Sequence, residues 1–538
     1  VDSLGWIAAL DSGQAAGTLM TRDLNGHYPA GTYVCLYDGE GQIRFGFDAR
    51  TTSESPGRIE LEVTPGNGGI YLKIVATNPA DPVRNIRVLM PGFETTYQSE
   101  PFYPPFLDMI GQYRVLRFMD WMRTNNNETE TWSQRTSPQH RSFAGGTGVP
   151  VEVMVELANR LQIDPWFCMP HRADDHFVRE FARYVRDNLD PGLTPYLEYS
   201  NEVWNGIFSQ AGYARQRGLE LNLSSNEYQA QLYFYSMRSV QLFQIWQGEF
   251  GSRDFVRVLA SQSANPWTGE QVMDFQDAYQ NADVLATAPY FGGFLGSPSL
   301  ESRVQQMSVD EVLDSCMADI NRVKVRMQTN YQNAQSRGLG LVAYEAGQHL
   351  AGHGGVENNQ TITDLFIAAN YHPRMEDLYQ AYLNAWNEAG GGLMAIFSSC
   401  GQYSKWGSWG IVEFQDQPWD NYPKYRAVQA YLNNLTGFSG GEHPVPQGFT
   451  LGQNYPNPFN PSTRIPYFLS EAGTVSLTIF DLAGRKVRQL VARGQSGGMH
   501  VAEWDGLKDN GEAVGSGVFF YRLTVDGYSA TRKLTLLR

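Results

Sequence analysis

Two glutamates follow short apolar runs that are typical of buried parallel strands. Glu202 lies in the segment 195–205, PYLEYSNEVWN, and Glu345 lies in the segment 340–347, GLVAYEAG. A charged group is costly to bury unless a site uses it. A carboxylic acid and a carboxylate that project from the same end of a barrel are what retaining glycoside hydrolysis requires. We therefore predict that Glu202 is the acid and base, and that Glu345 is the nucleophile.

Other polar and aromatic residues follow the predicted strands, and chemistry suggests a role for each. Asn201 would donate to a sugar 2-hydroxyl, Arg117 would keep Glu345 ionised, and Tyr290 would orient that carboxylate. His171 would bind a hydroxyl or tune the acid, with a structural histidine as the alternative. The tryptophans would stack on sugar rings, with loop core as the alternative for two of them. The remaining candidates are Trp204, Trp406, Trp409, Asp120, Trp121 and Gln262.

The elements that must position these residues alternate between strand and helix from about residue 85. Eight β/α units predict a (β/α)8 TIM barrel with long loops. A doubly wound sheet is the alternative, but the glycine-rich phosphate loop typical of it is not found. The expected strands are Asn85–Met90, Val115–Phe118, Pro165–Met169, Thr194–Tyr199, Val256–Ser261, Val284–Ala288, Gly340–Tyr344 and Leu393–Phe397. The clearest helices are Asp174–Asn188, Ser224–Gly248, Ser308–Arg337 and Met375–Ala389.

The regions on either side of the barrel read as all-β. Residues 1–84 are predicted to form an N-terminal β-sandwich, and residues 85–435 are predicted to form the barrel. A Gly/Pro linker at 436–446 then leads to an immunoglobulin-like sandwich at 447–538. In the first sandwich Tyr33, Tyr37, Phe45 and Phe47 mostly alternate as core residues do. This alternation favours a domain that braces the barrel, with carbohydrate binding as the alternative.

Composition excludes several classes of protein. The formal charge of −15 over 538 residues argues against a nucleic-acid partner, and no apolar stretch is long enough to span a membrane. The cysteines Cys35, Cys168, Cys316 and Cys400 form no metal motif, so buried free thiols are expected, with one disulfide as the alternative. No metal or organic cofactor is expected. The opening residues contain no signal peptide, and we expect that a leader has been removed.

The barrel resembles the clan A glycoside hydrolases, which include the family 5 cellulases and mannanases. Asn201-Glu202 and Glu345 match the acid/base and nucleophile positions of that clan, and Arg117 matches its strand-two arginine. His171 and Tyr290 resemble the histidine after strand three and the tyrosine near strand six. The usual strand-eight tryptophan is absent from the strand end, where residues 397–400 read FSSC.

The tail resembles the C-terminal sorting domain of type IX secretion. The motifs are LGQNYPNPFNPST at 451–463, IFDLAGRKV at 479–487, WDG at 504–506 and GSGVFFYR at 515–522. The resemblance implies export across the outer membrane by the type IX secretion machinery. It also implies an extracellular or cell-surface location.

The sequence thus predicts a secreted retaining endo-β-glycanase that cuts a polysaccharide or oligosaccharide. The most favoured substrate is β-1,4-glucan, as for an endoglucanase, and mannan, xylan and mixed-linkage glucan remain open. A non-catalytic carbohydrate-binding surface protein is the alternative from another class. An inverting hydrolase is a third possibility, favoured by carboxylates about 9 Å apart instead of about 5 Å.

Overall fold

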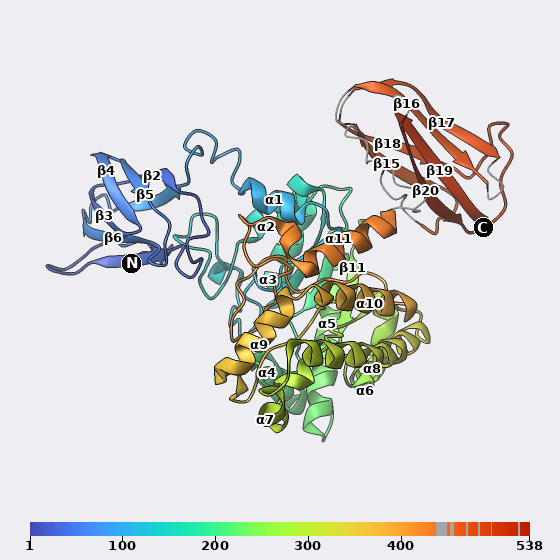
Figure 1. The fold of residues 1–538 in the computed structure, drawn as a ribbon, viewed down its shortest axis with the longest axis horizontal. Helices are drawn as coiled ribbons and strands as arrows, with labels where there is room; N and C mark the ends of the chain where they lie inside the picture. The colour runs from blue at the N-terminus through green and yellow to red at the C-terminus, as the bar shows by residue number, and fades with distance from the viewer. Residues whose placement is uncertain are drawn as a thin grey trace. The chain divides into compact units, whose positions relative to one another are not determined.

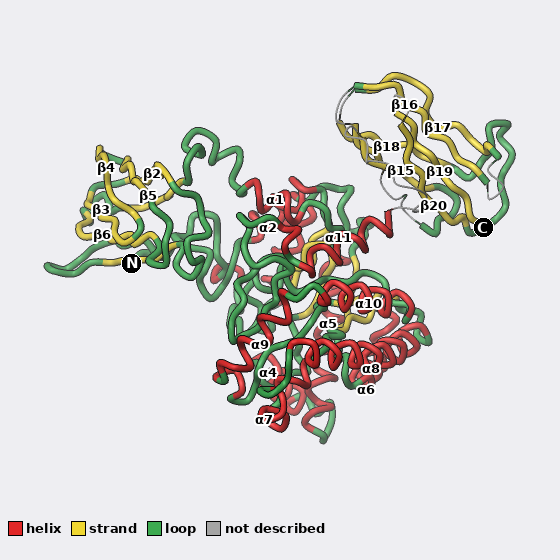
Figure 2. The backbone as a smooth tube through the Cα atoms, viewed as in Figure 1, coloured by secondary structure: helices red, strands yellow, loops and turns green. Residues whose placement is uncertain are grey.

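The computed structural model describes residues 1–436, 449–451, 454, 457–469, 472–481, 485–496, 498–525 and 528–538 (Figures 1 and 2). The chain divides into two compact units, Val1–Tyr425 and Arg426–Arg538. Apart from Thr436, the predicted linker at 436–446 lies outside the described residues.

The first unit begins with a β-sandwich. Its sheets have the strand orders β1-β6-β3 and β4-β5-β2-β7, and all neighbouring strands are antiparallel. Inward-facing side chains from both sheets, such as Cys35 and Ile74, share one core. The strands are β1 (Ala16–Met20), β2 (Gly31–Asp38), β3 (Gly41–Phe47), β4 (Ala49–Ser55), β5 (Arg58–Val63), β6 (Ile70–Thr77) and β7 (Arg84–Leu89).

Two expectations for this region are wrong. The segment expected as the first barrel strand forms β7, which pairs with β2, because its apolar residues Ile86 and Val88 pack on the sandwich core. Phe47 is 71% exposed instead of buried, because its positive φ of 59° interrupts the strand alternation. Tyr33 and Tyr37 are buried as predicted.

A parallel sheet forms the centre of the first unit. Its strands follow chain order, each parallel to the next, which is the strand order of a TIM-like fold. The strands are β8 (Val115–Arg117), β9 (Asp164–Met169), β10 (Tyr196–Tyr199), β11 (Val256–Ala260), β12 (Val284–Thr287) and β13 (Gly340–Ala343).

The expected eighth strand is only partly formed. Residues 393–397 run beside the end of β13, but the regular pairing is a single parallel bridge between Ala343 and Met394. Within residues 1–436, no backbone hydrogen bond joins this segment to β8. The predicted closed barrel is therefore present as an open parallel sheet with the strand order of a barrel.

Helices connect and cover the strands of this sheet (Figure 1). Several of these helices follow a capping residue. Ser308 and Glu311 form a capping box at the start of one of them, as predicted from the sequence. The helix α5 packs against α3, α4 and β10. The helices are α1 (Pro104–Ile110), α2 (Val151–Leu161), α3 (Asp175–Asn188), α4 (Ser209–Glu220), α5 (Glu227–Phe250), α6 (Pro266–Asp274), α7 (Glu301–Val304), α8 (Val309–Gln335), α9 (Gln360–Tyr371), α10 (Arg374–Glu388) and α11 (Pro423–Thr436).

The second unit contains an immunoglobulin-like sandwich. Its sheets have the orders β14-β15-β18 and β17-β16-β19-β20. Trp504 and Tyr521 are fully buried in the core between them. The strands are β14 (Phe449–Leu451), β15 (Thr463–Leu469), β16 (Gly473–Phe480), β17 (Lys486–Gln495), β18 (Gly498–Trp504), β19 (Gly517–Val525) and β20 (Tyr528–Leu536).

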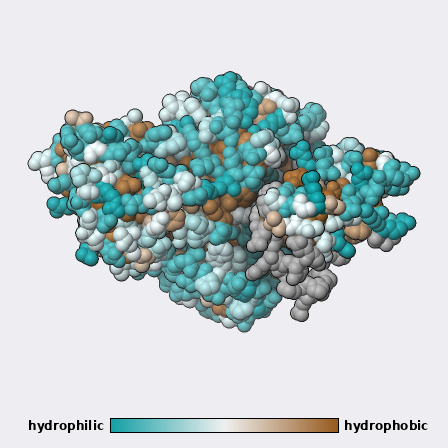
Figure 3. All heavy atoms as spheres, turned by 90° about the horizontal axis from the view of Figure 1, so that it is seen from above, coloured by the Kyte–Doolittle hydropathy of each residue, from teal (hydrophilic) through white to brown (hydrophobic). Residues whose placement is uncertain are grey.

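The surface seen in Figure 3 is mostly hydrophilic, with hydrophobic atoms in scattered groups. Across the described part of the chain, none of the helices combines the length and apolar character that a membrane crossing requires. All four cysteines are free thiols, as predicted. Cys35, Cys168 and Cys316 are buried as expected, whereas Cys400 is only half-buried.

Candidate active site

The register of the parallel strands brings charged residues together inside the sheet. Arg117, the last residue of β8, is paired in register with Trp166 of β9, and Glu198 of β10 is paired with Cys168, two residues further along β9. The Trp166 indole donates from Nε1 to Glu198 Oε2 at 2.9 Å. Glu198 has no exposed surface. A buried carboxylate of this kind requires a positive partner.

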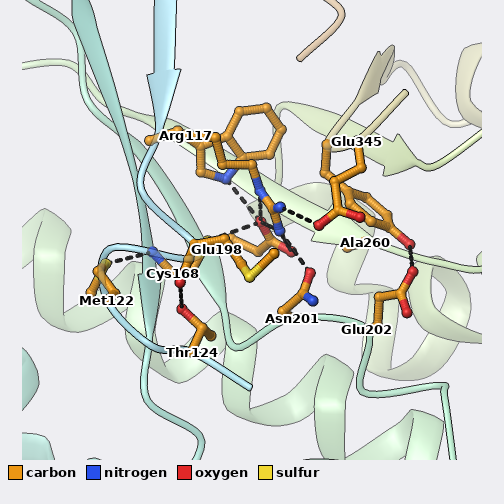
Figure 4. Close-up of polar contacts among 12 residues, drawn as sticks. Arg117, Met122, Thr124, Cys168, Glu198, Asn201, Glu202, Ala260 and Glu345 are labelled. Atoms are coloured by element: carbon orange, nitrogen blue, oxygen red, sulfur yellow. Dashed lines mark hydrogen bonds and ion pairs between the residues drawn. The ribbon is translucent and has the colours of Figure 1, made fainter. Parts of the chain in front are cut away.

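Arg117 is that partner, and it joins two carboxylates. Its Nε and Nη2 donate to Glu198 Oε2 at 3.1 and 2.9 Å, and its Nη1 donates to Glu345 Oε1 at 3.0 Å. Nη2 also donates to Asn201 Oδ1 at 2.9 Å. Figure 4 shows the guanidinium between the carboxylates of Glu198 and Glu345. The predicted contact between Arg117 and Glu345 is therefore present, and a third carboxylate shares the arginine.

Glu345 follows β13 and is held from two sides. Besides Arg117, the hydroxyl of Tyr290 donates to Glu345 Oε2 at 3.0 Å. Only 9% of Glu345 is exposed. Burial raises the pKa of Glu345 to about 7, and the charge of Glu202 adds to the rise, whereas the charge of Arg117 opposes it.

Glu202 lies in the turn that follows β10. The Tyr344 hydroxyl donates to Glu202 Oε1 at 3.0 Å, and Asn205 Nδ2 donates to Oε2 at 2.8 Å. Ser200 and Glu202 both have positive φ, 61° and 44°, a conformation that is unfavourable for residues with a Cβ and that is enriched at functional sites. Burial is the largest cause of the raised pKa of Glu202.

The two candidate catalytic carboxylates thus have different environments. Glu345 receives a hydrogen bond from a permanent cation, whereas the direct donors to Glu202 are a phenol and an amide. The two groups are electrostatically coupled, because the charge of Glu202 raises the pKa of Glu345. Coupled carboxyl groups in a buried site do not ionise independently, and their environments decide which one retains the proton.

Amide side chains fix Asn201 beside this cluster. Asn201 Nδ2 donates to Asn125 Oδ1 at 3.1 Å, and Gln210 Nε2 donates both to Asn125 Oδ1 and to the Asn201 carbonyl at 2.8 Å. Asn125 also lines a cavity of about 340 Å³, together with the predicted residues Asp120 and Trp121. The cavity therefore lies directly beyond the amide that holds Asn201.

A group of aromatic side chains packs together near Glu345. Trp409 makes edge contacts with Tyr290 and His349, at ring-centroid distances of 5.8 and 4.9 Å, and with Phe397 at 5.7 Å. Phe397 lies at the end of the partly formed eighth strand, where it donates its backbone N–H to the Ala346 carbonyl. Trp409, from the following loop, therefore reaches the tyrosine that binds Glu345.

The other predicted tryptophans are in two different settings. Trp204 Nε1 donates to the Tyr344 hydroxyl at 3.3 Å, so it belongs to the Glu202 network. Trp406 is 65% exposed and lies under the ammonium group of Lys405, 4.7 Å from Nζ to the ring centroid. It is therefore not loop core.

Besides Asp120, Trp121 and Trp406, two further predicted residues make no hydrogen bond, ion pair or ring contact, within residues 1–436, with the carboxylate cluster of Glu198, Glu202, Glu345 and Arg117. His171 is buried and makes an edge contact with Tyr213. Burial lowers the pKa of His171 to about 4, so the ring is neutral at neutral pH. The backbone amide of Gln262 donates to Thr268 Oγ1 at 3.1 Å, and its side chain makes no polar contact.

Sequence reasoning missed three members of the cluster: Glu198, Tyr344 and Asn205. A signal for Glu198 was available, because a charge in the middle of a buried strand requires a partner. Tyr344 directly precedes Glu345, but the sequence does not indicate that it serves the other glutamate. Among the residues described above, no group of three or more His, Cys, Asp or Glu side chains could hold a metal ion.

A known protein family matches part of the C-terminal sandwich. Residues 461–531 match the family model of the FlgD Ig-like domain. No curated protein sequence matches this chain.

Solved structures show weak similarity. An endo-beta-1,4-mannanase from Cellulomonas fimi is 11% identical, covering 80% of this chain and 88% of its own, with a TM-score of 0.33. A beta-glucuronidase from Bacteroides uniformis is 12% identical, covering 95% and 58%, with a TM-score of 0.36. PorU from Porphyromonas gingivalis is 21% identical, but the match spans only 18% of this chain and 10% of PorU, with a TM-score of 0.15.

Proposed function

We propose that this chain is a retaining glycoside hydrolase of β-linked polysaccharides, with Glu345 as the nucleophile and Glu202 as the acid and base. One observation carries the proposal: Arg117 donates to Glu345, whereas the direct donors to Glu202 are neutral. The arginine stabilises the carboxylate form of Glu345. Burial raises the pKa of both groups, to about 7 for Glu345, so above that pH Glu345 is ionised. We assign the proton that remains on the pair to Glu202, as the first step requires.

In the first step, Glu202 donates its proton to the glycosidic oxygen while a Glu345 oxygen bonds to the anomeric carbon. The bond from that carbon to the leaving oxygen breaks, and a glycosyl ester of Glu345 remains. Tyr290 and Arg117 bind one Glu345 oxygen each, which limits rotation of the carboxylate. Asn201, which accepts a hydrogen bond from Arg117, contacts the sugar 2-hydroxyl in this proposal.

In the second step, ionised Glu202 removes a proton from water, and the water oxygen attacks the anomeric carbon. The ester bond to Glu345 breaks, and the product keeps the original anomeric configuration. Tyr344 and Asn205 stabilise ionised Glu202 at this stage through their hydrogen bonds. No cofactor takes part in either step.

The substrate class we favour is β-1,4-glucan cut internally, with mannan, xylan and mixed-linkage glucan as alternatives. Trp409 contacts the tyrosine that binds Glu345, and Trp204 donates to the tyrosine that binds Glu202. The cavity lined by Asp120 and Trp121 is the place we propose for a further sugar. Sugar rings present C–H groups on one face, which suit aromatic surfaces.

The experiment that tests the activity is reducing-sugar release on a panel of β-linked polysaccharides. Carboxymethyl cellulose, mannan, xylan and mixed-linkage glucan represent the four candidates. Product from at least one polymer, with a mixture of oligosaccharides instead of one short sugar, is the expected result. Absence of product from every polymer, by a correctly folded chain, would overturn the proposal and favour a non-catalytic binding protein.

For the C-terminal sandwich we propose export through the type IX secretion machinery, which makes the protein extracellular or attached to the cell surface. The motifs from 451 to 522 support this role. In a bacterium that has this machinery, removal of residues 447–538 should leave the protein inside the cell. Unchanged export of the truncated chain would exclude a sorting role.

A further inference from the structure

The outer face of the sheet β1-β6-β3 carries a group of side chains that the proposed hydrolase does not use. In β6 the residues Ile70, Leu72 and Ile74 are buried in the sandwich core. Because side chains alternate along a strand, Tyr71 and Lys73 point away from that core. β3 and β6 are neighbours in the sheet, seen in the N-terminal part of Figure 1.

An aromatic pair stands on this face. The rings of Phe47 and Tyr71 have centroids 5.3 Å apart, and Phe47 is 71% exposed. The neighbouring strands leave space around Tyr71: Gly46 is its register partner on β3, and a Cβ added to Gly17 of β1 would lie 2.7 Å from the Tyr71 hydroxyl. The tyrosine therefore lies across the glycine of β1, and its register partner on that strand, Leu19, is on the same face of the sheet.

Phe47 is held in its exposed position by the residue that follows it. Asp48 Oδ2 accepts hydrogen bonds from the Tyr28 hydroxyl at 2.6 Å and from the amides of Gly66 and Gly69 at 2.9 and 2.8 Å. Phe47 itself has a φ of 59°, which is unfavourable for a residue with a Cβ. Backbone strain of this kind persists only where the surrounding contacts maintain it, and it is concentrated at functional sites.

Two cations lie next to the aromatic pair. Arg44 of β3 is the register partner of Lys73, and like charges in directly opposite positions destabilise a sheet. Among the described residues, no carboxylate lies within 4.0 Å of either cation, although ion pairs are frequent elsewhere in this chain. An anionic ligand would relieve this repulsion.

We propose that this face, defined by Phe47, Tyr71, Arg44 and Lys73, is a binding site for an acidic polysaccharide rich in uronic acid. The two rings contact the sugar faces, and the two cations pair with carboxylates along the polymer. The chain as a whole has a formal charge of −15, so a polyanion gains little elsewhere on the surface. The site does not depend on the hydrolase function.

Affinity of the full chain for polygalacturonate, measured by titration calorimetry at low salt, tests the proposal. We expect Phe47→Ala and the double variant Arg44→Gln/Lys73→Gln each to weaken binding at least about tenfold, because each removes one of the two kinds of contact. The matched control is Arg50→Gln, an exposed arginine of β4 whose register partner is Glu62. This control should bind like the wild type, and added salt should weaken wild-type binding.

Three results would overturn the proposal. They are no binding of polygalacturonate by the wild type, unchanged affinity in both test variants, and binding of neutral glucan or single-stranded DNA that equals or exceeds that of the polyuronate. Phe47 is exposed, so its loss leaves the core intact, and unfolding curves verify this. Hydrolysis of short oligosaccharides should be the same in all variants, so failure here is distinct from failure of the proposed hydrolase.

Discussion

Arg117 and Glu198 form a two-pronged ion pair inside the parallel sheet, in which Nε and Nη2 both donate to Glu198 Oε2. Glu198 is fully buried, and its side chain also accepts from Trp166. The pair occupies these two nitrogens and leaves Nη1 directed at Glu345. The orientation of the guanidinium on Glu345 therefore depends on a carboxylate that substrate does not reach.

Replacement of Glu198 tests this dependence. Glu198→Gln removes one charge of a buried ion pair and leaves Arg117 with a single carboxylate. We expect a loss of about 3 kcal/mol in the free energy of unfolding, measured with urea. The control Glu156→Gln, at an exposed position of α2, should stay within about 0.5 kcal/mol of the wild type. Equal stability of the two variants would show that Glu198 does not anchor the arginine.

Glu345→Gln should abolish turnover, because an amide cannot form the glycosyl ester. We expect kcat to fall by at least about 10³-fold, with the circular dichroism spectrum unchanged. Binding of an oligosaccharide should persist in this variant. Wild type and variant would behave alike in both assays if the protein only binds carbohydrate.

Glu202→Gln should affect substrates according to their leaving groups. A polysaccharide needs a proton on the departing oxygen, so its hydrolysis should fall by about 10²- to 10⁴-fold. A dinitrophenyl glycoside leaves without protonation, so formation of the glycosyl ester should be nearly unchanged, and azide should accelerate its breakdown. Equal losses on both kinds of substrate would contradict the role of Glu202 as the acid.

The pH dependence of kcat/KM on such an activated glycoside should report the ionisation of Glu345. Its pKa of about 7 means that activity is low in acid and rises as the pH passes through that value. The midpoint should lie above the ordinary value for a glutamate, because burial is the largest cause of the raised pKa. A midpoint near the ordinary value for a glutamate would show that burial does not raise the pKa of Glu345.

The configuration of the first product distinguishes the two hydrolytic mechanisms. If Glu345 is a nucleophile, proton NMR during the first minutes should show the β-anomer, with the α-anomer appearing only through mutarotation. Methanol added to the reaction should be converted to a β-methyl glycoside. Initial appearance of the α-anomer would mean inversion, with Glu345 activating water instead of bonding to carbon.

Much of the architecture could be predicted from the sequence, because buried parallel strands have a strong pattern. The segments around Pro165–Met169 and Gly340–Tyr344 are continuous apolar runs, and both form strands of the sheet. The segment at Asn85–Met90 was also expected to be a strand of this sheet, but Arg87 interrupts its apolar run and it pairs with β2. The sequence of one strand does not show which strand it pairs with. Here the pairing with β2 follows from the packing of Ile86 and Val88 on the core of the sandwich.

Some of the contacts of the site could also be predicted from the positions of residues at strand ends. Arg117 and Tyr290 were expected near Glu345 because strand ends meet at one edge of the sheet, and both contact it. The contact of Tyr344 with Glu202 depends on the path of the turn after β10, where two residues have positive φ. Such backbone conformations are not evident from residue type when glycine is absent.

Tyr344 and Glu345 are consecutive in the chain, yet the first binds Glu202 and the second binds Arg117. An insertion or deletion at the end of β13 would displace the support of the proton donor and the nucleophile together. We expect natural length variation to be excluded at this dipeptide. New substrate preferences would then arise in the loop that carries Trp406 and Trp409, where the chain can change length without altering the spacing of the two carboxylates.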